Sequence, residues 1–597
     1  MPKTGILGIV CVVSLTLSAT LPPVCVAAVP ATQALPAAST TGVSEFNTLE
    51  TFAEEFWTWR ARYQPFTSDD IPRIDHPAGL RDWSAAAIAK QREDLSQLES
   101  RWKRLDSPAS ASSRELASWQ VDYRLMGSAL ARVRWELDVN RRWERDPTFY
   151  VDQTLGALND SLLAPPPFGA ARSRAIVERL ENIPAILGNA KTNLHAARPF
   201  ARLAIDSLTN IRAQMQVVDR ELSSLLAGGA AEPSDELAKK LAPAVGRAAT
   251  ALESYRAWLV QREPSMPNET AVGRKQYEFF LREVALLPYT PEQLLALSRQ
   301  EWERAVAFEQ FEKQRNQGLP ELSLAASAED QIDRTERAEA AIREFLAAKG
   351  ILTVPAATPH YTVRALPGYL QALSDFGELD DFTSPKRLQE NGIRWIDPPS
   401  KKLGYFWMAT AKDPRPIIVH EGVPGHYFQM TLSWSHQDPI RRHYYDSGAN
   451  EGIGFYAEEM LLQAGLFDDS PRTREIIYNF MRLRALRVEV DVKLALGLFT
   501  LEQAATYLAS TVPMDVHTAG QEAASFATAP GQAISYQIGK IQILRFLSDA
   551  RIAQGDKFSL RAFHDFLWKN GNVPIALQRW EYLGLEDDLA QLAGGQP

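Results

Sequence analysis

The chain has 597 residues and a mass of 66.6 kDa, and its 45% hydrophobic and 23% charged residues exclude a disordered or fibrous protein. Both cysteines, Cys11 and Cys25, lie near the N-terminus, which excludes a scaffold held by disulfides. The formal net charge of −9 argues against a nucleic-acid partner, because binding to a phosphate backbone requires clustered Lys and Arg.

Residues 1–28 have the pattern of a secretory signal peptide. A lysine precedes the apolar run 5–21, and small residues follow it up to the expected cleavage site after residue 28. An uncleaved membrane anchor is the alternative, but hydroxyl residues from Ser14 onwards interrupt the run. Pro and Val before Cys25 argue against lipid attachment there. We therefore expect a periplasmic or secreted mature chain without stable membrane insertion.

Residues 29–45 are small, polar and Pro-containing, which predicts a disordered tether. Beyond it, apolar residues recur at three- and four-residue steps, as in the series Ile176, Leu180, Ile183 and Leu187. The periodicity predicts a mainly α-helical fold with an N-terminal helical half at 46–262 and a C-terminal half at 271–597. Residues 263–270 would form a linker or a long loop between the halves.

Two shorter patterns mark local structure. Thr290, followed by a proline and by Gln293, has the features of a capping box at a helix N-terminus. Residues 403–410 are rich in aromatic side chains and lie between two loops, which favours a short strand over a buried irregular segment. This small β element would precede the densest chemical cluster of the chain.

That cluster contains four of the nine histidines, at positions 420, 426, 436 and 443. His420 is followed directly by Glu421, and His426 comes shortly after. Imidazoles bind zinc, and a carboxylate beside the first ligand can act as the general base for a zinc-activated water. His436 and His443 lie among charged residues and fit an exposed connection better.

The spacing of the two histidines requires a broken helix. His420 and His426 are six positions apart, which places them about 120° apart around a regular helix. Pro424 cannot donate a backbone hydrogen bond, and Gly425 tolerates backbone angles that other residues avoid. We therefore expect a break between the histidines that lets both imidazoles reach one ion.

A third protein ligand is expected from a different helix. Glu451 follows His426 by 25 residues, and Glu458 lies seven residues further on, on nearly the same helix face. We assign Glu451 as the ligand and Glu458 as the group that accepts a ligand imidazole N–H, although the two roles could be exchanged. Solvent-exposed helix carboxylates are the alternative interpretation.

A hydrolase also needs a donor for the developing oxyanion. Tyr536, after the Pro530-Gly531 turn, is the first candidate and His517 the second, with core packing as the alternative for the tyrosine. Arg484, Arg487 and Asp491 share one helix face. Their pattern favours an internal ion pair over the alternative, a site that binds a carboxylate of the substrate.

Together these motifs resemble the bacterial family called domain of unknown function 885. The resemblance runs from about residue 48 to the C-terminus and rests on these patterns: His420-Glu421-x-x-Pro424-Gly425-His426-x-x-Gln429, Glu451-Gly452 with Tyr456 and Glu458, Pro530-Gly531-Gln532-Ala533 with Ser535, Tyr536 and Gly539, and Tyr289-Thr290-Pro291-Glu292. It implies a mostly helical, gluzincin-like metallopeptidase with zinc at His420, His426 and Glu451 and a general base at Glu421. The chain departs from the family pattern at Ala495, where a His is frequent, and at Ser525-Phe526, where an Arg-Tyr pair is frequent.

The sequence thus predicts an exported zinc hydrolase of gluzincin type, with one Zn²⁺ per chain, that cleaves a peptide or small amide substrate. Two alternatives stay open. One is a non-catalytic exported binding or scaffold protein, and the other is a metal-dependent amidase or esterase for a non-peptide substrate.

Overall fold

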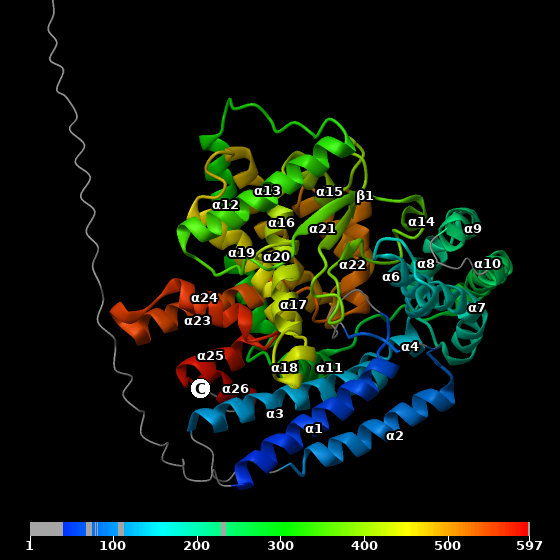
Figure 1. The fold of residues 1–597 in the computed structure, drawn as a ribbon, viewed down its shortest axis with the longest axis horizontal. Helices are drawn as coiled ribbons and strands as arrows, with labels where there is room; N and C mark the ends of the chain where they lie inside the picture. The colour runs from blue at the N-terminus through cyan, green and yellow to red at the C-terminus, as the bar shows by residue number, and fades with distance from the viewer. Residues whose placement is uncertain are drawn as a thin grey trace, which may run out of the picture. The chain divides into compact units, whose positions relative to one another are not determined.

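Most residues of the computed structural model are helical, and it describes residues 40–66, 74–77, 79, 81–105, 113–228 and 235–594 (Figure 1). The first helices are α1 (Thr40–Tyr63), α2 (Ala85–Trp102), α3 (Ser113–Arg134), α4 (Arg142–Arg145), α5 (Pro147–Val151), α6 (Ala157–Leu162), α7 (Ala170–Asn193), α8 (Arg198–Ser207), α9 (Ile211–Gly228) and α10 (Asp235–Arg262). The mainly α-helical fold predicted from the periodicity is confirmed.

The second half of the chain continues this pattern. Its helices are α11 (Arg274–Phe279), α12 (Pro291–Arg315), α13 (Ala328–Lys349), α14 (Gly368–Gln371), α15 (Tyr405–Lys412), α16 (Arg415–Glu421), α17 (His426–Trp434), α18 (Pro439–His443), α19 (Ser447–Ala464), α20 (Pro471–Ala495), α21 (Leu501–Thr511), α22 (Val516–Thr528), α23 (Ser535–Gln554), α24 (Leu560–Lys569), α25 (Ile575–Leu583) and α26 (Asp587–Leu592). Short π-helical or 3₁₀ turns are η1 (Trp135–Asn140), η2 (Asp152–Gly156), η3 (Glu263–Ser265), η4 (Phe280–Val284) and η5 (Gly555–Lys557).

The predicted signal peptide, residues 1–28, and most of the predicted tether lie outside the described residues. The predicted C-terminal end of the tether is wrong, because residues 40–45 belong to helix α1. Apolar residues at three-residue steps already begin in this segment, at Val43, Phe46 and Leu49, so the helical pattern extends further back than expected. Among the described residues, no helix is both long and apolar enough to span a membrane.

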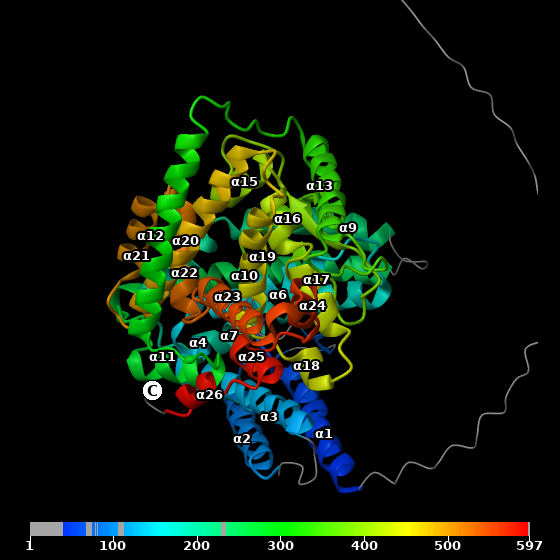
Figure 2. The ribbon, with the colours of Figure 1, turned by 90° about the vertical axis from the view of Figure 1, so that its left-hand side faces the viewer.

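The N-terminal helices pack through apolar stripes. Helices α1, α2 and α3 lie side by side in both views (Figures 1 and 2), and α10 packs against α7 and α9. The predicted stripe of α7 is confirmed, since Ile176, Leu180, Ile183 and Leu187 are all buried. Burying such a stripe is what makes helices of this length stable in water.

The C-terminal helices approach one another more closely. Helix α12, which begins with the predicted capping box at Thr290 and Gln293, packs along α20, and α19 packs along α23. A Cβ atom at Gly539 of α23 would lie only 2.0 Å from the carbonyl oxygen of Gly448 in α19. The two backbones can therefore touch only because glycine occupies this position.

A three-stranded sheet packs against α13. Strand β1 (Tyr361–Ala365) pairs in parallel with β3 (Gly392–Ile396), with Tyr361 opposite Gly392, and β2 (Asp380–Asp381) pairs with β3 in the antiparallel direction. The strand order is β1-β3-β2. A small β element is therefore present, but at another place in the chain than the predicted one.

The strand predicted at 403–410 is wrong, because residues 405–410 belong to helix α15. The backbone N–H of Met408 donates to the carbonyl oxygen of Gly404 at 2.8 Å, as in an α-helix. Tyr405 and Phe406 both pack against Phe480 of α20, with ring centroids 5.6 and 5.7 Å away. A short aromatic run fits a strand or a helix equally well, and here the neighbouring helix decides.

The proposed linker at 263–270 begins with the 3₁₀ turn η3, and its later residues have no regular structure. The described part of residues 41–597 forms one compact unit. A division into two halves therefore stays a prediction from composition.

Candidate metal centre

The helix that carries His420 is interrupted before His426, as predicted. Helix α16 ends at Glu421, and α17 begins at His426. A Cβ atom at Gly425 would lie 1.7 Å from the carbonyl oxygen of His420, so the chain can turn back here only with glycine. The indole N–H of Trp568 donates to the carbonyl oxygen of Pro424 at 2.6 Å and holds the turn against α24.

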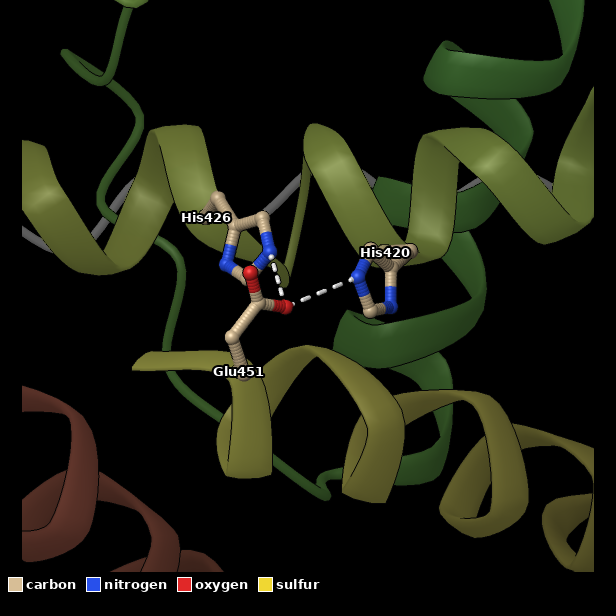
Figure 3. Close-up of side chains that lie close together, drawn as sticks. All are labelled: His420, His426 and Glu451. Atoms are coloured by element: carbon tan, nitrogen blue, oxygen red, sulfur yellow. Dashed lines mark hydrogen bonds and ion pairs between the residues drawn. The ribbon is translucent and has the colours of Figure 1, made fainter. Parts of the chain in front are cut away.

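The break brings three side chains together (Figure 3). One carboxylate oxygen of Glu451, from α19, lies 3.1 Å from Nε2 of His426 and 3.4 Å from Nε2 of His420. Two ligands at tetrahedral angles around zinc, with bonds of about 2.0–2.1 Å, are separated by about 3.3 Å. The three side chains are buried, and each offers one ligand atom within 4.8 Å of the others. The donor set therefore fits Zn²⁺.

A glycine makes room for the two imidazoles. A Cβ atom at Gly454, one turn after Glu451 in α19, would lie 3.0 Å from Cε1 of both His420 and His426. A larger residue would press on both rings. Helix α19 can therefore approach the break closely enough for Glu451 to reach both Nε2 atoms.

Glu458 lies on the far side of His420. Its Oε1 is 2.8 Å from Nδ1 of His420, and the guanidinium of Arg484 is 2.8 Å from the same carboxylate. A carboxylate at Nδ1 holds the proton there and leaves Nε2 directed at Glu451. Glu451, and not Glu458, thus lies within 3.4 Å of both Nε2 atoms, and the roles predicted for the two glutamates stay a prediction.

The electrostatics of the ligands are strongly coupled. Burial and the charge of Arg484 lower the pKa of His420, but its bonds to Glu451 and Glu458 outweigh both and raise it to about 9. Burial alone would raise the pKa of Glu451, whereas the two imidazoles hold it well below its usual range. Without metal, the proton that His420 retains therefore offsets the charge of the buried carboxylate, and a metal ion would displace it.

Tyr536 faces the same centre from the start of α23. Its ring stacks on that of His420 with centroids 6.0 Å apart and planes 8° apart, and the guanidinium of Arg487 lies 4.6 Å from the tyrosine ring centre. The preceding turn is fixed by Asp491, whose carboxylate accepts the N–H groups of Gly531 and Ala533 at 2.9–3.0 Å.

Glu421 and Tyr536 both line a cavity of about 180 Å³ next to the three clustered side chains, which we call the metal cavity. Its wall also contains Met430 of α17 and Phe382, which follows β2. The sequence therefore identified the residues at the centre of the cavity, and the fold supplies the wall.

Comparison with known proteins places the chain in a family. The model of the family described as bacterial protein of unknown function (DUF885) matches residues 72–580. The chain belongs to the DUF885 family. No curated protein matches it.

Two solved structures share the fold of this DUF885 protein. A candidate lipoprotein of unknown function from Shewanella oneidensis is 18% identical, with a TM-score of 0.67, and the match covers 90% of this chain and 99% of that one. A candidate lipoprotein from Colwellia psychrerythraea is 16% identical, with a TM-score of 0.70, and the match covers 93% of this chain and 100% of that one. At such low identity the likeness concerns the fold alone.

The departures of this DUF885 protein from the expected pattern fall at two different places. Ala495 is buried at the end of α20, where its carbonyl oxygen accepts the N–H of Gly273 at 2.9 Å, and it does not line the metal cavity. Ser525 and Phe526 of α22 do line it. The second departure therefore changes the wall that a substrate would touch.

Some expected site residues lie elsewhere. His517 is exposed in the first turn of α22 and is not among the residues lining the metal cavity, so we leave it out of the site. The direction of a side chain in the first turn of a helix depends on how that helix packs, and no local sequence pattern predicts it. His436 and His443 are half-buried around α18, and neither lines the cavity.

The arginines of α20 pair with other helices. Arg484 pairs with Glu458. Two guanidinium nitrogens of Arg487 donate to the carboxylate of Glu522 in α22, each at 2.7 Å. The Arg487–Glu522 pair lines the metal cavity and was not predicted. An acid on a helix 35 residues away gives no local signal.

A second unpredicted group stands behind Glu421. The hydroxyl of Tyr361 in β1 donates to Asp380 of β2, and Arg394 of β3 donates to the same carboxylate at 2.6 Å. Burial raises the pKa of Asp380, the charge of Arg394 lowers it, and the charge of Glu421 raises it again. The small sheet therefore places the charged pair of Asp380 and Arg394 near Glu421, the expected general base.

Proposed function

We propose that this protein is an exported, zinc-dependent hydrolase and, more specifically, a metallopeptidase with a zincin-like, gluzincin-type catalytic region. The observation that carries the proposal is the convergence of His420, His426 and Glu451 from three helix segments, with Glu421 on the wall of the same cavity. Two imidazoles, one carboxylate and an adjacent acid are the donor set of hydrolytic zinc sites.

Bound zinc would polarise a water molecule and the carbonyl group of the substrate. Glu421 takes a proton from the attacking water and delivers it to the leaving amine. Tyr536, which lines the same cavity, donates a hydrogen bond to the oxygen that gains negative charge. Glu458 keeps the His420 ring in the tautomer that leaves Nε2 without a proton.

The same proposal includes export. The pattern of residues 1–28 supports it, and so does the description of both structural relatives as candidate lipoproteins. The substrate would then be an exported or external peptide, or a small amide.

The proposal is tested by offering the purified, zinc-loaded mature chain a set of internally quenched peptides beside small amide and ester substrates. We expect hydrolysis of peptides that is lost with a chelator and restored by zinc. Hydrolysis of the small amides or esters alone would replace the peptidase assignment, and no hydrolysis by a zinc-loaded chain would favour a non-catalytic binding protein.

A further inference from the structure

A second cavity adjoins the metal cavity. It has a volume of about 430 Å³, and Phe382 lines both cavities. Helix α17 also borders both, because Met430 lines the metal cavity and Trp434, one turn later, lines the second. We call the second one the arginine cavity, after Arg172 and Arg179, which line it.

The two arginines come from one face of α7. They are seven positions apart, which is two helical turns. The guanidinium of Arg172 donates to the backbone carbonyl oxygen of Ser161 at 2.9 Å, and that of Arg179 donates to Ala157 at 2.9 Å. Within the described part of the chain, neither forms an ion pair with a carboxylate. Backbone carbonyls therefore hold these guanidinium groups in place.

Most acids around the arginine cavity are already paired. Asp380 pairs with Arg394 at 2.6 Å, Asp381 pairs with Arg387, and Asp75 lies 3.7 Å from Lys386. Four acids line this cavity: Asp75, Asp160, Asp380 and Asp381.

The fourth acid, Asp160, interacts electrostatically with three guanidinium groups, those of Arg81, Arg172 and Arg179. Burial lowers the pKa of each of these arginines. The guanidinium groups of Arg81 and Arg179 both lie over the ring of Phe66, at 4.1 and 4.7 Å from its centre. Three half-buried guanidinium groups thus act on this one carboxylate, and two of them, those of Arg172 and Arg179, line the arginine cavity, so the cavity favours an added anion.

The distance between the cavities suits a short peptide. His426 and Trp434 are eight residues apart in α17, which corresponds to about 12 Å along the helix axis. An extended peptide rises about 3.3 Å per residue, so about three to four residues span this distance. A group at that separation from the bond being cleaved would enter the arginine cavity.

We propose that the arginine cavity is a subsite for a carboxylate of the peptide substrate, three to four residues from the scissile bond, bound by Arg179, with the charge of Arg172 beside it. The inference rests on the proposed peptidase function and names its substrate class. An Asp or Glu side chain and the C-terminal carboxylate have the same chemistry. Arginine binds it through paired, charge-assisted hydrogen bonds.

The experiment uses the zinc-loaded mature chain and hexapeptides in matched pairs. One set of pairs differs by Glu against Gln at each position, and the other by a free against an amidated C-terminus. The measured quantity is the ratio of kcat/KM within each pair. We expect a ratio of about 10 or more for a carboxylate three to four residues from the cleaved bond, and the pair that shows it identifies the carboxylate.

Two variants locate the effect. Arg179→Gln is expected to reduce the ratio about tenfold, toward one, whereas Arg212→Gln, on the exposed face of α9, leaves it unchanged. Arg172 holds the backbone after α6, so its variant is used only if it retains zinc and its circular dichroism spectrum. Ratios of one throughout for the wild-type chain, or a preference that Arg179→Gln does not alter, would overturn the inference.

Failure of the peptidase proposal gives a different result. If no peptide is hydrolysed, the same pairs are labelled, and their binding to the zinc-loaded chain is measured by fluorescence anisotropy. Tighter binding of the carboxylate peptide that Arg179→Gln removes would uphold the subsite without catalysis, and equal binding within every pair would overturn it.

Discussion

Helix α7 and helix α19 bury very different side chains. On α7 the buried face is mainly apolar and repeats every three to four residues, as in Ile176, Leu180 and Ile183. On α19 nearly every residue is buried, including Glu451 and Glu458. Buried carboxylates destabilise a fold unless partners compensate them, so α19 is not arranged for stability alone. The buried apolar face of α7 serves the stability of the fold, whereas the buried carboxylates of α19 belong to the candidate site.

The largest expected effect is on catalysis. Glu421→Gln keeps the size of the side chain but removes the proton acceptor, so we expect peptide hydrolysis to fall about 10²- to 10⁴-fold while zinc content is unchanged. Steady-state kinetics and elemental analysis measure the two quantities. Glu502→Gln, on the exposed first turn of α21, is the matched control. Undiminished hydrolysis by Glu421→Gln would remove Glu421 from its role.

A pair of glycine substitutions compares the two regions directly. Gly425→Ala places a methyl group against the carbonyl of His420 and is expected to lower the free energy of unfolding by about 3 kcal/mol and to abolish zinc binding. Gly188→Ala, at an exposed position of α7 with nothing within 4 Å of the added Cβ, is expected to stabilise by about 0.5–1 kcal/mol. Chemical denaturation measures both. Equal effects would show that the break is not constrained as described.

The partner of His420 has a smaller effect. Glu458→Gln removes the charge at Nδ1, and we expect zinc affinity to fall about 10- to 100-fold. Glu459→Gln is the control, because its carboxylate pairs with Lys540 and Arg304 and not with a ligand. Competition with a zinc-binding dye measures the affinity. A loss in Glu459→Gln as large as in Glu458→Gln would make the effect one of general destabilisation.

The smallest effect is that of pH. The pKa of His420 is raised from 6.5 to about 9 in the metal-free chain, so its proton stabilises that chain fully below pH 6.5, and this stabilisation is lost as pH rises through 9. Zinc must displace the same proton, so below pH 9 its affinity is expected to rise about tenfold per pH unit. Titration calorimetry in buffers of different ionisation enthalpy would show release of about one proton at pH 7, and no release would contradict the coupling.

The sequence predicted those features whose signal is local. Pro424 and Gly425 lie between the histidines, so the helix break could be read from the chain, and the apolar steps of α7 predicted its buried face. The pairs Arg487–Glu522 and Arg394–Asp380 each join two different helices or strands, and no local pattern in the sequence predicts them. The aromatic run before α16 was misassigned as a strand because only the contact with α20 distinguishes the two structures.

The central claim is that His420, His426 and Glu451 hold one zinc ion, and elemental analysis of the purified mature protein tests it most directly. We predict about one zinc per chain in the wild type and in His517→Ala, whose imidazole is exposed and outside the cavity, and almost none in His420→Ala. Equal metal in all three proteins would contradict the account.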